Sequence, residues 1–364
     1  MASFDEVLKD CTKLGTKIPT SEYLENGKYP IIDQGQNDIA GYYDSDDGVF
    51  EDVPAIVFGD HTRVVKYVDK PCFLGADGVK LLCPVDKDIN CKYLFYQLSY
   101  ADIPNTGYNR HFKWVKALDF KIPSSDEQNH VVEVLDKVTS LIFLRKQQIA
   151  KLDELVKARF VEMFGEPVQN PNCWKTENLL DLGYCKNGMN FHRDDCGTEI
   201  HCLGVGDFKN HSTIRNVGSL PFISLNELPT SEYLLQDGDI VFVRSNGNKE
   251  LVGRCLAIYP AKIPVTYSGF CIRYRLTSNK ITVSYLLRVL KADSVRKKMT
   301  GRGANIQNLN QQILAQLVVP IPPLSLQNQF AAFVERVDQQ KQTVQQSLEK
   351  LELMKKALMQ EYFG

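Results

Sequence analysis

IPSSDEQNHVVEVLDKVTSLIFLRKQQIAKLDELVKARFVEMFG at residues 122–165 and IPPLSLQNQFAAFVERVDQQKQTVQQSLEKLELMKKALMQEYFG at residues 321–364 decide the fold of this chain. The two stretches align without a gap at an offset of 199 residues (321 minus 122). Both open with Ile-Pro, both carry Gln-Asn at their seventh and eighth positions, and both close with Phe-Gly. An internal repeat of this length indicates a chain built from two copies of one structural unit.

Each copy has the hydrophobic period of a long helix. Apolar residues follow one another in alternating steps of four and three, which is the spacing of a coiled-coil seam rather than of a broad apolar face. The predicted seam consists of Val131, Leu135, Val138, Ile142, Ile149, Leu152, Val334, Val337, Val344, Leu348 and Leu351. Pro123 and Pro322 mark the helix starts, where a missing N–H is harmless. Ser125 and Gln128 fit a capping box, and Gly165 suits the position just after the first helix.

Each seam needs a partner to cover it. The simplest partner is the other helix of the same chain, and a different protein or a second copy of the chain is the alternative. Over residues 126–163 the first helix would be about 57 Å long, at about 1.5 Å per residue.

The segments before the two helices also resemble each other, though more loosely. PAIVFGDHTRVVKYV (54–68) matches GDIVFVRSNGNKELVGRCLAIY (238–259), and each is a strand, a polar loop and another strand. Residues 106–123 similarly match residues 300–322. We therefore predict an α+β chain in which two mixed domains alternate with two long helices, with pseudo-twofold symmetry. The predicted boundaries are 1–121 and 166–320 for the domains, and 122–165 and 321–364 for the helices.

The composition is that of a globular protein, and we expect the protein to be cytoplasmic. Hydrophobic residues make up 43% of the chain and charged residues 24%, which excludes a disordered chain. No apolar run is long enough for a membrane span. The opening MASFDEVLKDCTK lacks the basic and apolar regions of a secretory signal.

The ten cysteines are expected to be free thiols, since no pair has CxxC spacing. His192, Cys196, His201 and Cys202 provide four soft ligands within a short stretch. Their spacing matches no common zinc pattern, so no metal site is predicted.

Charge is distributed unevenly over the two domains. The whole chain has a net charge of −1, but residues 1–121 carry 14 basic and 19 acidic residues, whereas residues 166–320 carry 18 basic and 13 acidic residues. A basic cluster in the second domain comprises Arg288, Lys291, Arg296, Lys297, Lys298 and Arg302. Such a cluster is typical of a polyanion-binding surface, although a solvated helix face has the same composition.

These features together resemble the specificity subunits of type I restriction-modification enzymes. The resemblance rests on Ile-Pro-Pro-Leu-x-x-Gln at 321–327 with its degenerate copy at 122–128, and on the long helices that end in Phe-Gly. It also rests on Gly-x-x-x-x-Ile-x-Asn-Leu at 301–309 and on GKYPIIDQGQNDIAGYYD at 27–44. It covers essentially the whole chain. The first domain departs from the pattern by being short and acidic.

The resemblance implies two target-recognition domains and an antiparallel intrachain coiled coil. Each domain would read half of a bipartite target in double-stranded DNA, with the coiled coil as a ruler between them. Two modification subunits and the restriction subunits would be partners. S-adenosylmethionine, ATP and Mg²⁺ would be used by those partners, so no cofactor is expected in this chain.

Polar loops between strands provide the candidates for DNA contact, because Arg, Lys, Asn and Gln pair with base edges and phosphates. In the first domain we expect such a loop at Asp60–Arg63 and a second around Asn109. The predicted contacts are His61, Thr62, Arg63, Asn109, Arg110, His111, Lys113, Arg244, Ser245, Asn246, Asn248, Lys249, Lys297, Lys298, Arg302 and Asn305. Ordinary polar turns have a similar composition.

No catalytic motif is present in the sequence. It has no P-loop, no Gly-rich dinucleotide turn and no Asn-Pro-Pro-aromatic motif; Asn170-Pro171-Asn172-Cys173 matches only the start of the last. We therefore predict a non-catalytic protein. The alternatives are an enzyme with fused recognition domains and a coiled-coil scaffold that does not bind DNA.

Overall fold

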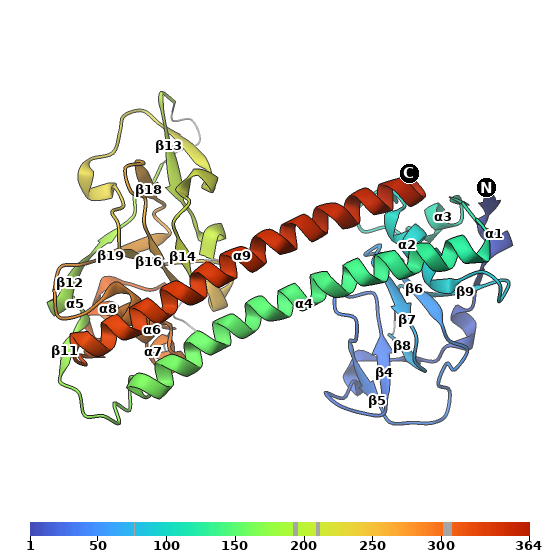
Figure 1. Ribbon diagram of the computed structural model, residues 1–364, viewed down its shortest axis with the longest axis horizontal. Helices are drawn as coiled ribbons and strands as arrows, with labels where there is room; N and C mark the ends of the chain where they lie inside the picture. Colours follow the sequence, from blue (N-terminus) through green and yellow to red (C-terminus); the bar gives the residue numbers. More distant parts are fainter. Residues whose placement is uncertain (76, 192–195, 209–211, 301–307) are drawn as a thin grey trace. The chain divides into compact units, whose positions relative to one another are not determined.

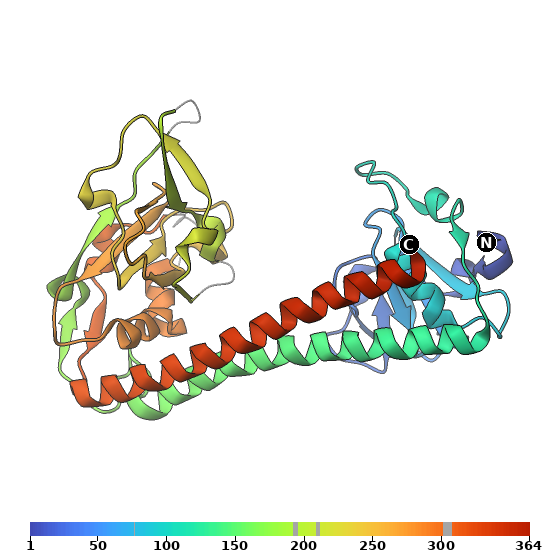
Figure 2. The ribbon, with the colours of Figure 1, turned by 45° about the horizontal axis from the view of Figure 1, so that its top comes forward.

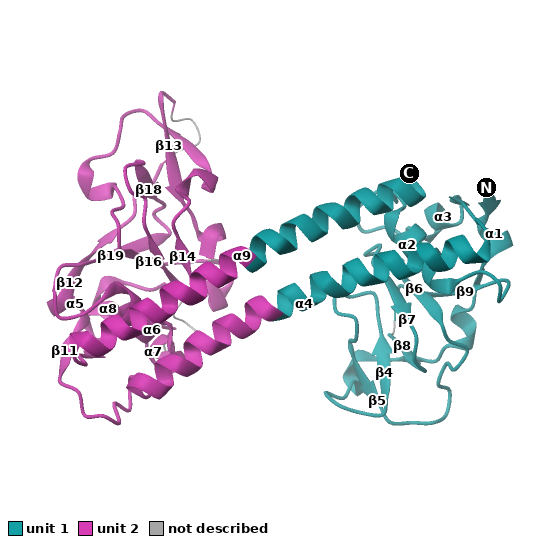
Figure 3. Ribbon diagram, in the orientation of Figure 1, with its two compact units in different colours: residues 1–147, 344–364 teal, residues 148–343 magenta. Residues whose placement is uncertain are grey.

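A computed structural model describes residues 1–75, 77–191, 196–208, 212–300 and 308–364. The chain divides into two compact units (Figure 3). Unit 1 comprises residues 1–147 and 344–364, and unit 2 comprises residues 148–343. Both boundaries fall inside the two long helices, α4 (Ser125–Phe164) and α9 (Leu324–Phe363). Each unit therefore contains one mixed domain and half of each helix.

Unit 1 contains two four-stranded sheets, with strand orders β2-β9-β6-β7 and β3-β8-β4-β5, and the two-stranded pair β1-β10. Strand β6 has the sequence AIVFG and is buried along its whole length. Helix α2 packs on β6 and β7. The elements before α4 are β1 (Ala2–Ser3), α1 (Phe4–Val7), β2 (Leu8–Asp10), β3 (Lys17–Ile18), β4 (Tyr29–Ile32), β5 (Gly41–Tyr43), β6 (Ala55–Gly59), β7 (Val65–Val68), β8 (Phe73–Gly75), β9 (Val79–Pro84), α2 (Cys91–Tyr100), α3 (Phe112–Val115) and β10 (Asp119–Phe120).

Unit 2 has a related plan, with a five-stranded sheet of order β12-β19-β16-β17-β14, a three-stranded sheet of order β15-β13-β18 and the two-stranded pair β11-β20. Strand β16, with the sequence DIVFV, is the counterpart of β6 and is also fully buried. The elements between the long helices are β11 (Thr176–Asn178), α5 (Leu179–Leu182), β12 (Gly183–Asn187), β13 (Thr198–Leu203), β14 (Thr213–Ile214), β15 (Phe222–Leu225), β16 (Asp239–Val243), β17 (Cys255–Ile258), β18 (Val265–Tyr267), β19 (Cys271–Leu276), α6 (Val283–Lys291), α7 (Asp293–Thr300), α8 (Gln311–Ala315) and β20 (Val318–Pro320).

The long helices pack against each other within each unit, and they run antiparallel (Figures 1 and 2). In unit 1, Val131 and Leu135 share a hydrophobic core with Met359 and Phe363. In unit 2, the ring of Phe160 lies 5.5 Å from that of Phe330. An ion pair between Lys341 of α9 and Asp153 of α4 (2.7 Å) also joins the two helices in this unit. The predicted fold class, two mixed domains with an antiparallel intrachain helix pair, is confirmed.

Burial along the two helices follows the 3-4 period. The predicted seam residues that are buried are Val131, Leu135, Val138, Ile142, Val337, Val344 and Leu348. Those that are partly exposed are Ile149, Leu152, Val334 and Leu351.

The start of α4 differs from the predicted capping box by one residue. Ser124, not Ser125, is the capping residue, because its N–H and Oγ both donate to Glu127 Oε2 (3.0 and 2.8 Å). Glu127 and not Gln128 completes the capping box, so the Gln128 side chain can bond elsewhere. At the other end, Gly165 has φ +75°, in the left-handed region that favours glycine after a helix.

A buried glutamine joins each long helix to the domain that precedes it. In unit 1, Gln128 Oε1 accepts from the Asn90 N–H at the start of α2 (2.9 Å), and its Nε2 donates to Pro123 O (2.9 Å). In unit 2, Gln327 accepts from the Thr282 N–H at the start of α6 (2.8 Å) and donates to Pro322 O (2.8 Å). The Gln of each Ile-Pro repeat thus gives a hydrogen-bond acceptor to a backbone N–H at the start of a helix, where such groups lack a partner within the helix.

Candidate functional site

Three loops meet at the residue that follows β6 in unit 1. The N–H of Asp60 donates to Gly78 O in the β8–β9 turn (2.7 Å), and Asp60 O accepts from the N–H of His111 (2.8 Å). The Asp60 carboxylate also accepts from the N–H of Phe112, at the start of α3 (2.7 Å). The β6–β7 loop, the β8–β9 turn and the segment before α3 are therefore fixed to one another.

The same junction occurs in unit 2 after β16. The N–H of Arg244 donates to Phe270 O in the β18–β19 turn (2.7 Å), and Arg244 O accepts from the N–H of Leu309, just before α8 (2.7 Å). Ser245 forms a bridge with Asn308 beside it. Residues 54–68 and 106–123 of unit 1 thus come together in the same way as residues 238–259 and 308–322 of unit 2.

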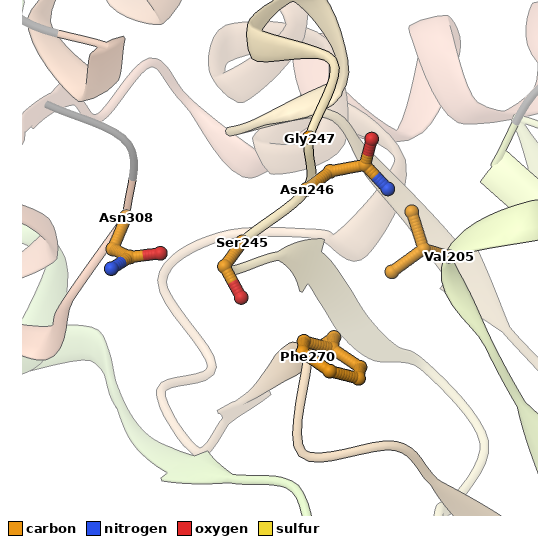
Figure 4. A pocket seen from close by; sticks show the side chains of 6 residues that line it. All are labelled: Val205, Ser245, Asn246, Gly247, Phe270 and Asn308. Atoms are coloured by element: carbon orange, nitrogen blue, oxygen red, sulfur yellow. The ribbon is translucent and has the colours of Figure 1, made fainter.

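A pocket of about 480 Å³ opens at the junction of unit 2 (Figure 4). Its lining residues are Val205, Ser245, Asn246, Gly247, Phe270 and Asn308. In Figure 4 the side chains of Ser245 and Asn308 lie on one side, and those of Asn246 and Val205 on the other. The two amides each offer donors and an acceptor, and exposed Phe270 adds an apolar face. This combination suits a planar group that carries hydrogen-bonding edges, such as a nucleic-acid base.

Several predicted contact residues of unit 1 serve the loops instead of facing solvent. His111 is completely buried, with its Nδ1 facing Asp60 O at 2.9 Å, so its side chain cannot reach DNA in this conformation. Arg63 is partly buried and its Nη1 donates to Ile103 O (2.9 Å). Asp60 is buried, and its carboxylate accepts from the N–H of Phe112. These residues pin the two predicted loops of the domain to each other.

The remaining predicted residues of unit 1 lie at the surface of these loops. Thr62, Asn109, Arg110 and Lys113 are exposed, and His61 is partly buried. Gln34, which the sequence did not single out, supports the first loop. Its Oε1 accepts from the His61 N–H (3.2 Å), and its carbonyl oxygen accepts from Thr62 Oγ1 (2.7 Å).

In unit 2, Arg244, Ser245 and Asn246 are partly buried at the junction, and Asn248 and Lys249 are exposed on the β16–β17 loop. Arg244 Nη1 donates to Gly269 O (3.3 Å), which holds its side chain against the β18–β19 turn. The predicted residues Arg302 and Asn305 lie outside the described residues.

The residues of the basic cluster that the structure describes do not all lie on one surface. Arg288 and Lys291 turn toward the helix pair and line a cavity of about 240 Å³ with Asp153 and Asp338. Burial lowers the pKa of Lys291 to about 8 and raises that of the Asp338 carboxyl. Lys297 and Lys298 are exposed on α7 and remain candidates for phosphate contact. The exposed basic surface is thus smaller than the sequence suggested, because helix periodicity turns Arg288 and Lys291 inward.

The residues considered for zinc do not converge where the structure describes them. The His201 ring stacks on Phe222 and its Nδ1 faces Leu220 O (2.9 Å), while Cys202 is buried and Cys196 is exposed. His192 lies outside the described residues. Within the described ranges no group of three or more His, Cys, Asp or Glu side chains is placed to hold a metal ion.

Over the same ranges, no helix has the length and apolarity needed to cross a membrane.

Comparisons with known proteins agree with this architecture. The family model described as the type I restriction modification DNA specificity domain matches residues 5–154 and 199–353. The StySPI specificity subunit of Salmonella potsdam is 28% identical over 241 residues, which is 61% of this chain and 50% of that protein. The EcoR124I/EcoR124II specificity subunit of Escherichia coli is 20% identical over 363 residues, covering 88% of this chain and 82% of that protein. The match thus spans only half the length of the Salmonella protein.

Among solved structures, the S subunit of a type I restriction-modification system from M. genitalium has a similar fold. The TM-score is 0.59 at 16% identity, and the match covers 100% of this chain and 95% of that chain.

Proposed function

Because the chain belongs to the family of type I restriction-modification DNA specificity domains, we propose that it is the specificity subunit of such a system. Unit 1 and unit 2 each read one half of a bipartite target in double-stranded DNA. The observation that carries this proposal is the three-loop junction present in both units. Two copies of one loop arrangement in one chain suit two half-sites better than they suit a single reaction centre.

The chemistry of the unit 2 junction supports direct reading of base edges. The Arg244 guanidinium offers a planar set of donors, which pairs well with a guanine edge. Asn246 and Asn308 can pair with an adenine edge in the same way. Lys297 and Lys298, on α7, carry the charge for phosphate contacts, which position the protein without specifying sequence.

The helix pair supports a second role, the recruitment of modification subunits. In unit 1 five large apolar side chains are exposed within two short stretches of the pair: Leu141, Phe143, Leu144, Leu353 and Met354. The ion pair of Lys146 with Glu352 places these stretches next to each other. Exposed apolar side chains gathered in this way mark protein interaction surfaces. Two modification subunits and the restriction subunits are the proposed partners, and S-adenosylmethionine, ATP and Mg²⁺ would be used by those partners.

The substitution Arg244→Ala tests sequence reading by unit 2. We expect one position of the unit 2 half-site to become degenerate, because a bidentate Arg–guanine contact is worth about 1–3 kcal/mol. The half-site read by unit 1 should stay unchanged. The measurement is methylation-site sequencing of DNA from cells that carry the variant together with its modification subunits.

Lys298→Ala is the matched control, since loss of a phosphate contact weakens binding to all sequences alike and leaves the motif intact. An unchanged motif in Arg244→Ala would count against the assignment of the junction. Binding of the wild-type complex that shows neither sequence preference nor salt dependence would contradict the proposed function itself.

A further inference from the structure

One aromatic side chain of unit 1 is exposed although its position is firmly held. Tyr108, in the segment between α2 and α3, is 89% exposed. Its ring stacks on that of His61, with the centroids 4.8 Å apart and the planes at 9°. His61 Nδ1 is buried without a hydrogen-bond partner, so hydrogen bonding through that atom does not explain why the ring is placed there. What His61 provides at this point is a flat support for Tyr108.

The loop that carries Tyr108 is anchored on both sides. Before it, Ile103 O accepts from Arg63 Nη1 (2.9 Å). After it, His111 is buried and bonded to Asp60. Gly107, next to Tyr108, has φ +79° and makes the turn at the tip. Anchors, turn and stack together present one face of the ring to the outside.

The charge around Tyr108 differs from that of the rest of its domain. Residues 1–121 carry an excess of acidic residues, yet residues 103–118 contain Arg110, Lys113 and Lys116 and no Asp or Glu. All three cations are exposed. A local basic surface in an acidic domain favours a polyanion over a protein surface as the group that covers Tyr108.

We propose that Tyr108 is a specificity-determining residue for the half-site read by unit 1, and that its free face contacts the 5-methyl group of a thymine in the major groove. This inference rests on the proposed function. One face of the ring is covered by His61, so Tyr108 cannot insert between base pairs, which would need both faces. Apolar contact with the thymine methyl needs one face only. His61 is a positioning residue, because it acts through Tyr108.

The experiment uses the complex of the chain with its modification subunits and replaces each thymine of the unit 1 half-site by uracil, which lacks only the methyl group. With the wild-type chain we expect one such replacement to weaken binding about fourfold, the worth of one buried methyl group. With Tyr108→Ala the same replacement should have no effect. Tyr108→Phe, which keeps the ring and loses the hydroxyl, should behave as the wild type.

His61 is tested by rescue. His61→Ala should reduce the discrimination between thymine and uracil, and His61→Phe, which can stack, should restore it. A wild-type complex that reads both half-sites but binds every uracil-substituted target equally would overturn the Tyr108 inference and leave the proposed function intact. If the Tyr108→Ala chain still discriminates between thymine and uracil but no longer binds its modification subunits, the ring belongs to a protein interface and the inference is wrong.

Discussion

At the residue scale, the two buried glutamines show how a repeated signature is explained by geometry. Gln128 and Gln327 occupy the same position of the Ile-Pro repeat and make the same two kinds of hydrogen bond, one to a helix-start N–H and one to a proline carbonyl. An amide offers both an acceptor and a donor on one short planar group at any pH of interest. A glutamate at this position would leave the carbonyl without a donor.

Gln327→Ala should therefore destabilise unit 2. Three backbone groups, the Thr282 N–H, Lys280 O and Pro322 O, lose their partner. The loss of a partner costs about 1–3 kcal/mol for each group that stays buried. Urea unfolding monitored by circular dichroism measures the change in the free energy of unfolding. Gln342→Ala, an exposed position on the same helix, is the control and should change that free energy by less than about 0.5 kcal/mol. Equal effects of the two substitutions would refute the structural role of Gln327.

Loop residues show where prediction from sequence ends. The sequence predicted polar loops at 60–63 and around Asn109, and the structure has loops after β6 and before α3. The sequence could not tell that His111 and Arg63 face inward while Tyr108 faces out. Loops have no period, so the direction of a side chain depends on which carbonyl oxygens of other loops need donors. For the same reason the sequence did not distinguish Ser124, which caps α4, from its neighbour Ser125.

At the scale of elements, the long helices were the most predictable part and the sheets the least. A 3-4 period repeats along each helix and is visible in the sequence alone. Strands β6 and β16 were also expected, from their apolar runs. The pairing of the strands was not predicted. For example, β19 lies between β12 and β16, at sequence separations that no local pattern encodes. The basic cluster around α6 was misjudged for a related reason, since its inward face depends on packing against α4 and α9.

Lys291, at the end of α6, gives a prediction about pH. Burial lowers its pKa to about 8, helped by the nearby cations Arg288 and Lys341 and opposed by Cys255 and Asp153. A lysine whose pKa is lowered by folding destabilises the fold below pH 8, where it must be charged, and this cost fades as the pH rises toward the unfolded value near 10.4.

Lys291→Met should accordingly raise the free energy of unfolding at pH 7, by about 1–3 kcal/mol. The gain should fall by more than half at pH 9.5, because the wild-type lysine is then neutral in the folded state. Urea unfolding of both proteins at the two pH values measures this difference. Lys298→Met, which removes an exposed lysine on the neighbouring helix, should give no such gain. A gain for Lys291→Met that is the same at both pH values would show that packing and not charge is responsible.

At the scale of the whole molecule, the boundaries of the sequence repeat do not coincide with the boundaries of the compact units. The sequence repeat predicts boundaries at the ends of the helices, near residues 121, 165 and 320. The compact units divide inside α4 and α9, because the two halves of each helix pack on different domains. Unit 1 therefore depends on residues 344–364, which follow its own domain by more than two hundred positions.

Two phenylalanines at equivalent positions of the repeat test this dependence. Phe363, near the end of α9, is buried in unit 1 with its ring 5.3 Å from that of Tyr93 on α2. Phe164, at the end of α4, is buried in unit 2 with its ring 4.7 Å from that of Tyr285 on α6. Each Phe→Ala change should cost about 3–5 kcal/mol, since a large buried ring is replaced by a cavity.

The location of the damage distinguishes the two variants. Phe363→Ala should increase amide hydrogen exchange in α2, at residues 91–100, and leave α6 protected, whereas Phe164→Ala should expose α6, at residues 283–291, and spare α2. Hydrogen exchange read by mass spectrometry resolves both segments, and each variant serves as the control for the other. Local opening is expected because each unit has its own core, so the loss of one ring lowers the stability of one unit first. If Phe363→Ala left α2 as protected as in the wild type, α9 would not be part of the folded core of unit 1.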